Sequence, residues 1–178
     1  PILHSFPTRR SSDLDTLLVN SESSVTLTGL QSVGAGVDAH DGFERAVLSG
    51  GSSNDRLDAS QSGMPVTLFG NDGDDTLLGS SSNDVLDGGA GHDVAEFVGS
   101  NITLTSNSVM GAGDDALTSV EGLQLVADGN GSVIDASAYS AGSVTIIGSS
   151  GDDTLTGGTG DDIIIAGSGR DVVSGGDG

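Results

Sequence analysis

The sequence predicts an all-β parallel solenoid, and three observations lead to that fold class. Two blocks, residues 70–96 and 148–174, repeat a nine-residue unit in which a glycine-rich turn precedes a short apolar strand. Strand-like triplets separated by Gly, Ser, Asn and Asp recur every 9 to 11 residues elsewhere. No stretch of useful length follows the period of a helix. A short repeat of this kind favours stacked coils, because one unit alone cannot bury its apolar face.

The nonamers keep two places in phase with each other. The sixth place is always aspartate: Asp75, Asp84, Asp93, Asp153, Asp162 and Asp171. The eighth place is always apolar: Leu77, Leu86, Ala95, Leu155, Ile164 and Val173. A flexible Gly/Asp/Ser linker, which is the alternative interpretation, would not keep these two places in register. Successive nonamers should turn on opposite edges, so that Asp75 stacks on Asp93 and Asp153 on Asp171.

The turns have the chemistry that calcium requires. Calcium takes six to eight hard oxygen ligands from carboxylates, carbonyls and water. Glycine reaches positive φ at little cost, so a glycine turn can direct alternate carbonyl oxygens inward. A divalent cation between stacked turns would also remove the repulsion between their aspartates.

The pattern resembles the repeats-in-toxin, or hemolysin-type calcium-binding, family, whose motif is GGxGxDx followed by a large apolar residue and any residue. This resemblance implies a right-handed parallel β-roll, calcium as the bound ion and secretion from a Gram-negative-type cell by a type I system. It implies carboxylate ligands from the six nonamer aspartates and, through a degenerate turn at residues 50–55, from Asp55. It implies carbonyl ligands from Gly73, Gly89, Gly91, Gly151, Gly158, Gly160, Gly167 and Gly169.

A longer repeat organises the chain into two tandem copies. A shift of 77 residues places Val25 on Ile102 and Glu44 on Glu121, and a one-residue insertion then keeps the nonamers aligned. We therefore expect a partial coil at residues 15–24, a first copy at 25–101 and a second copy at 102–178. The second copy ends partway through a turn, which we interpret as a slice of a longer array. The coil should be least regular over residues 28–43 and 105–120.

Residues 1–14 are excluded from the expected fold. Residues 6–14 resemble one reading frame of a common sequencing adapter, which suggests an assembly artefact. A basic N-terminal arm or a processing site is the alternative reading of Arg9 and Arg10.

Composition limits the function. With 26 acidic and 5 basic residues the net charge is −21, and this sign excludes nucleic acid as a partner. Only 34% of the residues are hydrophobic, so the core must be thin and the metal-free chain should be largely disordered. Calcium would then supply folding free energy, at an affinity of about 10⁻⁴–10⁻³ M that is typical of extracellular modules. There is no cysteine to staple the chain and no apolar run long enough to span a membrane.

No catalytic constellation stands out in the sequence. The three histidines are too scattered for a zinc site, no serine lies in a G-x-S-x-G elbow with a histidine partner, and Lys is absent. Asp114 and Asp115 lie outside a clean nonamer, and we interpret them as a solvated turn. We expect a non-catalytic calcium-dependent structural module of a large secreted or cell-surface bacterial protein, in contact with the rest of the same long chain. Two alternatives stay open: the carboxyl-terminal accessory of a secreted protease, lipase or epimerase, and an adhesin or surface-layer segment with a cell-surface or polysaccharide partner.

Overall fold

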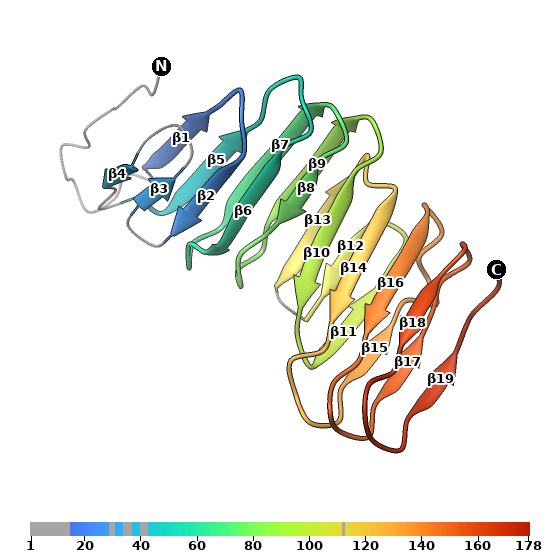
Figure 1. The fold of residues 1–178 in the computed structure, drawn as a ribbon. Helices are drawn as coiled ribbons and strands as arrows, with labels where there is room; N and C mark the ends of the chain where they lie inside the picture. Colours follow the sequence, from blue (N-terminus) through green and yellow to red (C-terminus); the bar gives the residue numbers. More distant parts are fainter. Residues whose placement is uncertain (1–14, 29–30, 34–36, 40–42, 112) are drawn as a thin grey trace.

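The computed structural model describes residues 15–28, 31–33, 37–39, 43–111 and 113–178 (Figure 1). Within this part of the chain there are 19 strands and no helix, and the strands form two sheets. The expectation for residues 1–14 lies outside the described residues. The all-β class predicted from the nonamer period is confirmed.

In each sheet, neighbouring strands are adjacent along the rod but are mostly not consecutive in the sequence. In spatial order the ten-stranded sheet contains β1 (Thr16–Asn20), β5 (Arg45–Ser49), β7 (Val66–Asp72), β9 (Val85–Ala90), β13 (Asp114–Thr118), β12 (Ser108–Met110), β11 (Asn101–Leu104), β15 (Val133–Asp135), β17 (Thr154–Thr156) and β19 (Val172–Ser174). The nine-stranded sheet contains β18 (Ile163–Ile165), β16 (Ser143–Ile147), β14 (Gly122–Val126), β10 (Val94–Val98), β8 (Thr76–Leu78), β6 (Arg56–Gln61), β2 (Val25–Thr28), β3 (Gln31–Val33) and β4 (Val37–Ala39).

From β5 to β10, and again from β14 to β19, the chain passes alternately through one sheet and then the other, so two passes make one coil (Figure 1). Neighbouring coils pair in parallel and in register, which stacks Leu57, Leu77 and Ala95 along one sheet. Leu68 and Leu86 stack in the same way along the other sheet. These five side chains are fully buried, so the apolar ladders form the core between the sheets. The parallel β-roll expected from the sequence is therefore the observed architecture.

The eighth-place side chains follow this rule except near the last coil. Leu77, Leu86, Ala95 and Leu155 are fully buried, and Ile164 is partly buried against the core. Val173 is 49% exposed, because β19 is the last strand of its sheet and no further coil covers it.

The coil is interrupted where the sequence is least periodic. Strand β2 pairs antiparallel with β3, and β3 pairs antiparallel with β4. Strands β11, β12 and β13 form the equivalent antiparallel meander in the second copy. Each meander replaces one parallel pass by three strands. The irregularity expected over residues 28–43 and 105–120 is confirmed for the described part of these segments.

Equivalent segments of the two copies lie in opposite sheets. Strand β7 belongs to the ten-stranded sheet, whereas its counterpart β16 belongs to the nine-stranded sheet, and β8 and β17 show the same exchange. In the first copy the meander counts as one pass through a sheet, and strands β5 to β10 add six more, so the number of passes is odd. The second copy therefore begins in the opposite sheet, half a coil out of phase with the first. Equivalent turns therefore face opposite edges of the rod.

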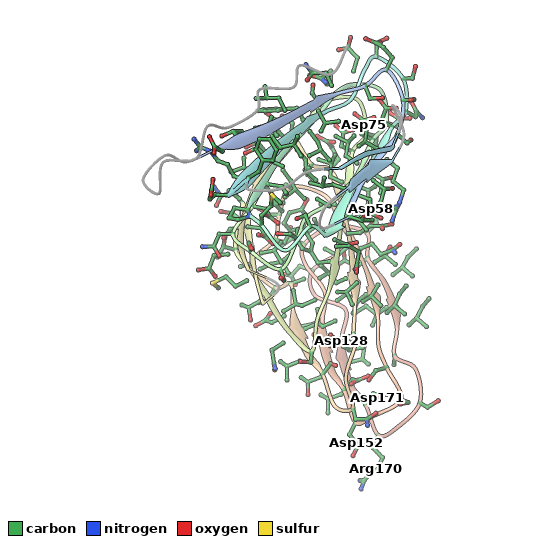
Figure 2. All side chains as sticks on the ribbon, turned by 90° about the vertical axis from the view of Figure 1, so that its left-hand side faces the viewer. Asp58, Asp75, Asp128, Asp152, Arg170 and Asp171 are labelled. Atoms are coloured by element: carbon green, nitrogen blue, oxygen red, sulfur yellow. The ribbon has the colours of Figure 1, made fainter. Side chains whose placement is uncertain are left out.

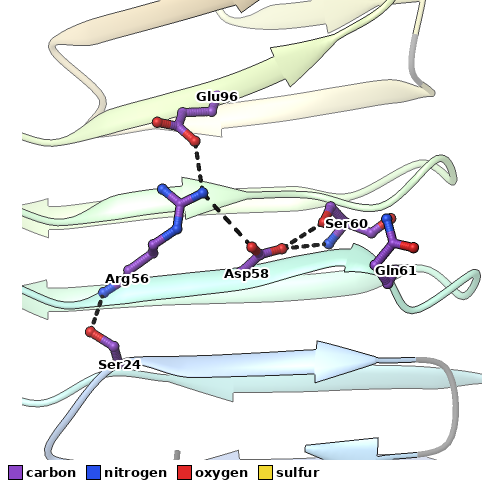
Figure 3. Close-up of polar contacts among 6 residues, drawn as sticks. All are labelled: Ser24, Arg56, Asp58, Ser60, Gln61 and Glu96. Atoms are coloured by element: carbon purple, nitrogen blue, oxygen red, sulfur yellow. Dashed lines mark hydrogen bonds and ion pairs between the residues drawn. The ribbon is translucent and has the colours of Figure 1, made fainter. Parts of the chain in front are cut away.

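On the outer face of the nine-stranded sheet, Arg56 bridges two strands that are not direct neighbours (Figure 3). Its Nη2 lies 3.0 Å from Oε2 of Glu96 on β10 and 3.7 Å from Oδ2 of Asp58 on β6. The Arg56 amide N–H also donates to Oγ of Ser24. Because the Arg56 side chain is 46% exposed, we expect the ion pair between Arg56 and Glu96 to contribute only about 0–1 kcal/mol to the free energy of unfolding.

Candidate metal-binding turns

Acidic side chains of the turns form a column along each of the two edges of the rod, and the first column is the following one. We call its edge the upper edge; it consists of the turns that lead from the ten-stranded into the nine-stranded sheet, with Asp55, Asp75, Asp93, Glu121 and Asp162. The amide of Asp55 donates to Oδ1 of Asp75 at 2.7 Å, and the amide of Asp75 donates to Oδ1 of Asp93 at 2.8 Å. The amide of Asp93 donates to Oε2 of Glu121 at 3.0 Å. Each of these accepting carboxylates thus fixes the turn of the preceding coil.

The opposite edge, which we call the lower edge, carries Asp84, Asp115, Asp153 and Asp171. The amide of Asp84 donates to Oδ1 of Asp115 at 2.9 Å, and the amide of Asp153 donates to Oδ1 of Asp171 at 3.0 Å. Figure 2 shows Asp75 on the upper part of the molecule and Asp152 and Asp171 at its lower end. The expected stacking of Asp75 on Asp93 and of Asp153 on Asp171 is confirmed.

The turns are of two kinds, which differ in the hydrogen bonding of the second carboxylate oxygen, Oδ2. In capped turns, the amide four residues earlier donates to Oδ2 of the aspartate. The capping donors are Gly51 to Asp55 at 2.8 Å, Ser80 to Asp84 at 2.5 Å, Ser149 to Asp153 at 2.7 Å and Gly158 to Asp162 at 2.6 Å. In Asp84, Asp153 and Asp162 both oxygens are occupied, because Oδ1 accepts an amide N–H from the neighbouring coil.

In open turns, the amide four residues earlier does not reach the carboxylate. Oδ2 of Asp75, Asp93 and Asp115 is buried and has no hydrogen-bond partner among the described residues. Leaving a buried acceptor unsatisfied costs about 1–3 kcal/mol, and more if it is charged. These three oxygens are therefore the atoms in the turns that most need a cation or a proton.

One backbone conformation distinguishes the open turns. The residues four and two places before the aspartate both have positive φ: Asn71 and Gly73 (81° and 117°), Gly89 and Gly91 (104° and 144°), Gly111 and Gly113 (132° and 120°), and Gly167 and Gly169 (93° and 138°). The last pair precedes Asp171, so that turn has the open backbone as well. Glycine is required at Gly91 for two reasons: its φ is positive, and a Cβ there would collide with the carbonyl oxygen of Gly73 in the preceding coil.

Burial raises the pKa of the three open-turn aspartates with an unpartnered oxygen, whereas the capped turns are mixed, because burial also raises the pKa of Asp84. Burial raises the pKa of Asp75 and of Asp93, and the charges of neighbouring carboxylates raise both further. Burial raises the pKa of Asp115 to about 7, with additional contributions from Asp84 and Asp114. In the capped turn of Asp153, amide donation from Ser132 and Ser149 lowers the pKa instead. A carboxylate that resists ionisation in the metal-free fold is one that a cation would stabilise strongly.

The donor set fits calcium rather than a softer metal. In the described residues, no three Asp, Glu or His side chains come together as a cluster. A cation in an open turn would therefore take most of its ligands from main-chain carbonyls, with one or two carboxylates. Hard oxygens from a flexible backbone are what calcium prefers, whereas zinc would require nitrogen or sulfur ligands.

The structure places all seven expected aspartates in turns at the two edges. Five of the expected glycines, Gly73, Gly89, Gly91, Gly167 and Gly169, have positive φ in open turns. The other three, Gly151, Gly158 and Gly160, belong to the capped turns of Asp153 and Asp162 and do not have positive φ. That these residues bind calcium stays a prediction for both groups.

Two acidic residues of the columns were not expected from the sequence. Asp115, interpreted above as part of a solvated turn, is only 1% exposed and lies in an open turn. Gly111, Gly113, Asp115 and Leu117 hold the second, fourth, sixth and eighth places of a nonamer, and only Met110 at the first place departs from it. This partial match was the signal that could have found it. Glu121 lies outside any nonamer, so the sequence gives no comparable signal for it.

Stacked parallel coils whose glycine turns carry rows of buried carboxylates define a metal-binding β-roll. In agreement, the family model described as RTX calcium-binding nonapeptide repeat (4 copies) matches residues 67–95 and 145–178. These two segments thus match RTX calcium-binding repeats, which support calcium binding and a structural role for the repeats. No curated protein matches the chain.

Proposed function

We propose that this chain is a non-catalytic structural solenoid whose condensation depends on calcium in the turns of both edges. The observation that carries the proposal is the set of buried, unpartnered Oδ2 atoms of Asp75, Asp93 and Asp115. Two of these aspartates lie in the nonamers that match the calcium-binding repeat. The ligands proposed are the seven aspartates and eight glycine carbonyls named from the sequence.

The net charge of the chain explains why folding should depend on cations. The net charge is −21, and the columns stack one aspartate on the next across the coils, where their charges repel. Without cations, this repulsion and the thin core oppose the compact state. Calcium bound only by the folded turns would stabilise the fold increasingly as its concentration rises above the dissociation constant.

The cellular setting follows from the same argument. The RTX repeat family is typical of secreted bacterial proteins. If affinity lies in the submillimolar to millimolar range typical of extracellular modules, the chain stays extended in a low-calcium cytosol and becomes a rod outside the cell. In the described residues, no helix is long and apolar enough to cross a membrane. From the family match and this affinity range we propose export followed by folding, with two tandem copies of the 77-residue unit acting as a spacer in a longer chain.

A calcium titration followed by far-ultraviolet circular dichroism tests this function. The expected result is a cooperative gain of β signal as calcium replaces chelator, with magnesium at the same concentration much less effective. Equal β content in chelator and in millimolar calcium would contradict it.

The family model that matches the chain describes a calcium-binding repeat and not a catalytic domain. An accessory role beside a secreted enzyme and a role in adhesion stay alternatives. The full-length gene separates the first of these, because an H-E-x-x-H or G-x-S-x-G domain in the same chain would favour the enzyme.

A further inference from the structure

Residues 110–115, which comprise the turn between β12 and β13 and the strand residues that flank it, lie outside both segments that match the calcium-binding repeat. The backbone of this turn nevertheless has the open form, with φ of 132° at Gly111 and 120° at Gly113. Asp115 follows this turn and is 1% exposed. Its Oδ2 is one of the three buried oxygens without a partner among the described residues.

This turn is stacked directly on the turn of residues 79–84, although the two are separated by the β11–β12 insertion. The amide of Asp84 donates to Oδ1 of Asp115, and the amide of Asp114 donates to Oδ1 of Asn83 at 3.1 Å. Gly113 lies so close to the carbonyl of Ser82 that a Cβ would collide with it. The two partners are 31 residues apart in sequence, whereas the stacked aspartates within the nonamer blocks are 18 apart.

We propose that Asp115 is the carboxylate ligand of a further calcium site, formed between the turns 79–84 and 110–115 on the lower edge. The oxygens at hand are Oδ2 of Asp115 and main-chain carbonyls of the described residues of the two turns, a hard donor set of the kind calcium takes. Asp84 has both oxygens occupied by amides, so Asp115 supplies the free carboxylate oxygen.

The site has a structural consequence that the nonamer sites do not have. Strand β13 pairs in parallel with β9, and β12 and β11 then lead away to β15. A cation shared by turns 79–84 and 110–115 would therefore fasten the meander to the last coil before it. It would reinforce the β9–β13 junction, at which the parallel stacking of the ten-stranded sheet gives way to the meander, whereas the nine-stranded sheet continues in parallel from β10 to β14.

The burial of Asp115 has a competing explanation, namely that the carboxyl group keeps its proton at neutral pH. The two explanations differ in the number of ions bound.

The test counts calcium bound to the full chain by equilibrium dialysis, in wild type, Asp115→Asn and Asp114→Asn. Asp114 is the exposed neighbour, so the control removes the same charge from the same turn. We expect Asp115→Asn to bind one ion fewer than wild type and Asp114→Asn to bind the wild-type number. An unchanged count in Asp115→Asn would overturn the site.

A second measurement does not depend on the variant folding. Hydrogen exchange of wild type, with and without calcium, should show calcium-dependent protection of residues 108–118 together with residues 70–96. Protection of 70–96 without any at 108–118 would overturn the Asp115 site and leave the proposed function standing. A wild-type chain that binds no calcium at all would instead refute the proposed function, on which this site rests.

Discussion

The amide N–H of Asp75 donates to Oδ1 of Asp93, 18 residues later, at 2.8 Å. The same two carboxylates each keep a second oxygen buried and unpartnered among the described residues. In both side chains Oδ1 thus holds the preceding turn in place, while Oδ2 makes no hydrogen bond to the described residues. The hydrogen-bonded column and the candidate cation site are therefore made by the same residues.

The substitution Asp93→Asn should weaken calcium binding at the upper edge. The carboxamide oxygen of the new side chain can still accept the N–H of Asp75, but no second anionic oxygen remains for a cation. We expect an affinity loss of about tenfold or more at that site, equivalent to about 1.4 kcal/mol, measured by calorimetric titration. Asp72→Asn is the matched control, since Asp72 is exposed on the neighbouring turn. Equal affinity in Asp93→Asn and wild type would remove Asp93 from the ligand set.

Replacing Gly91 by Ala should disrupt the open turn itself. Its φ is 144°, and a Cβ would meet the carbonyl of Gly73 in the preceding coil. We expect both a loss of calcium affinity and a lower melting temperature in calcium. Gly63→Ala is the control, because Gly63 also has positive φ, 67°, but nothing lies within 4 Å of the added Cβ. That control should cost only about 1 kcal/mol from backbone strain, without changing calcium binding. Similar behaviour of the two variants would show that stacking of the turns is unimportant.

Acidification should favour the compact state of the metal-free chain. The pKa of Asp115 is raised from 3.8 to about 7, and burial also raises the pKa of Asp75, Asp84 and Asp93. The folded state therefore binds more protons than the unfolded state across this interval. For Asp115 the stabilising contribution is complete below the ordinary pKa and is lost as pH rises through about 7.

Circular dichroism in chelator should accordingly show more β structure at mildly acidic than at mildly alkaline pH. Asp115→Asn should flatten part of this dependence, because its side chain does not titrate. Calcium affinity should change in the opposite direction and fall with acidification, since protons compete for the same oxygens. A metal-free chain that gains structure as pH rises would show that the sign of this linkage is wrong.

The core ladder sets the stability of the calcium-loaded rod. Leu77 is fully buried and stacks on Leu57 and Ala95, so Leu77→Ala should lower the free energy of unfolding by about 2–5 kcal/mol. Leu78→Ala changes the next residue on the same strand, which is only half-buried, and should cost considerably less. Chemical denaturation in saturating calcium measures both. Comparable losses would mean that the eighth place is not the inward-facing one.

The regular half of each copy could be predicted because its two signals reinforce each other. An aspartate at the sixth place and an apolar residue at the eighth specify a turn and an inward side chain, as Asp75 and Leu77 show. The meanders could be expected only as irregular coil, since short polar segments do not specify antiparallel pairing. Asp115 was missed because the insertion moves it away from the 18-residue spacing.

The division into capped and open turns was not predictable from the motif. It depends on φ at the second place of the nonamer. Ser80 and Ser149 avoid positive φ and cap, whereas Asn71 and Gly89 adopt it. Gly158 could adopt either conformation and caps, so glycine alone does not decide the outcome. The packing of the next coil has to select between the two.

Small-angle X-ray scattering of one sample, first in chelator and then in millimolar calcium, tests most directly whether cations in the turns condense this acidic chain. We expect a large, expanded particle in chelator and a compact rod in calcium, with the change reversed by renewed chelation. A rod of the same dimensions in both buffers would contradict the account.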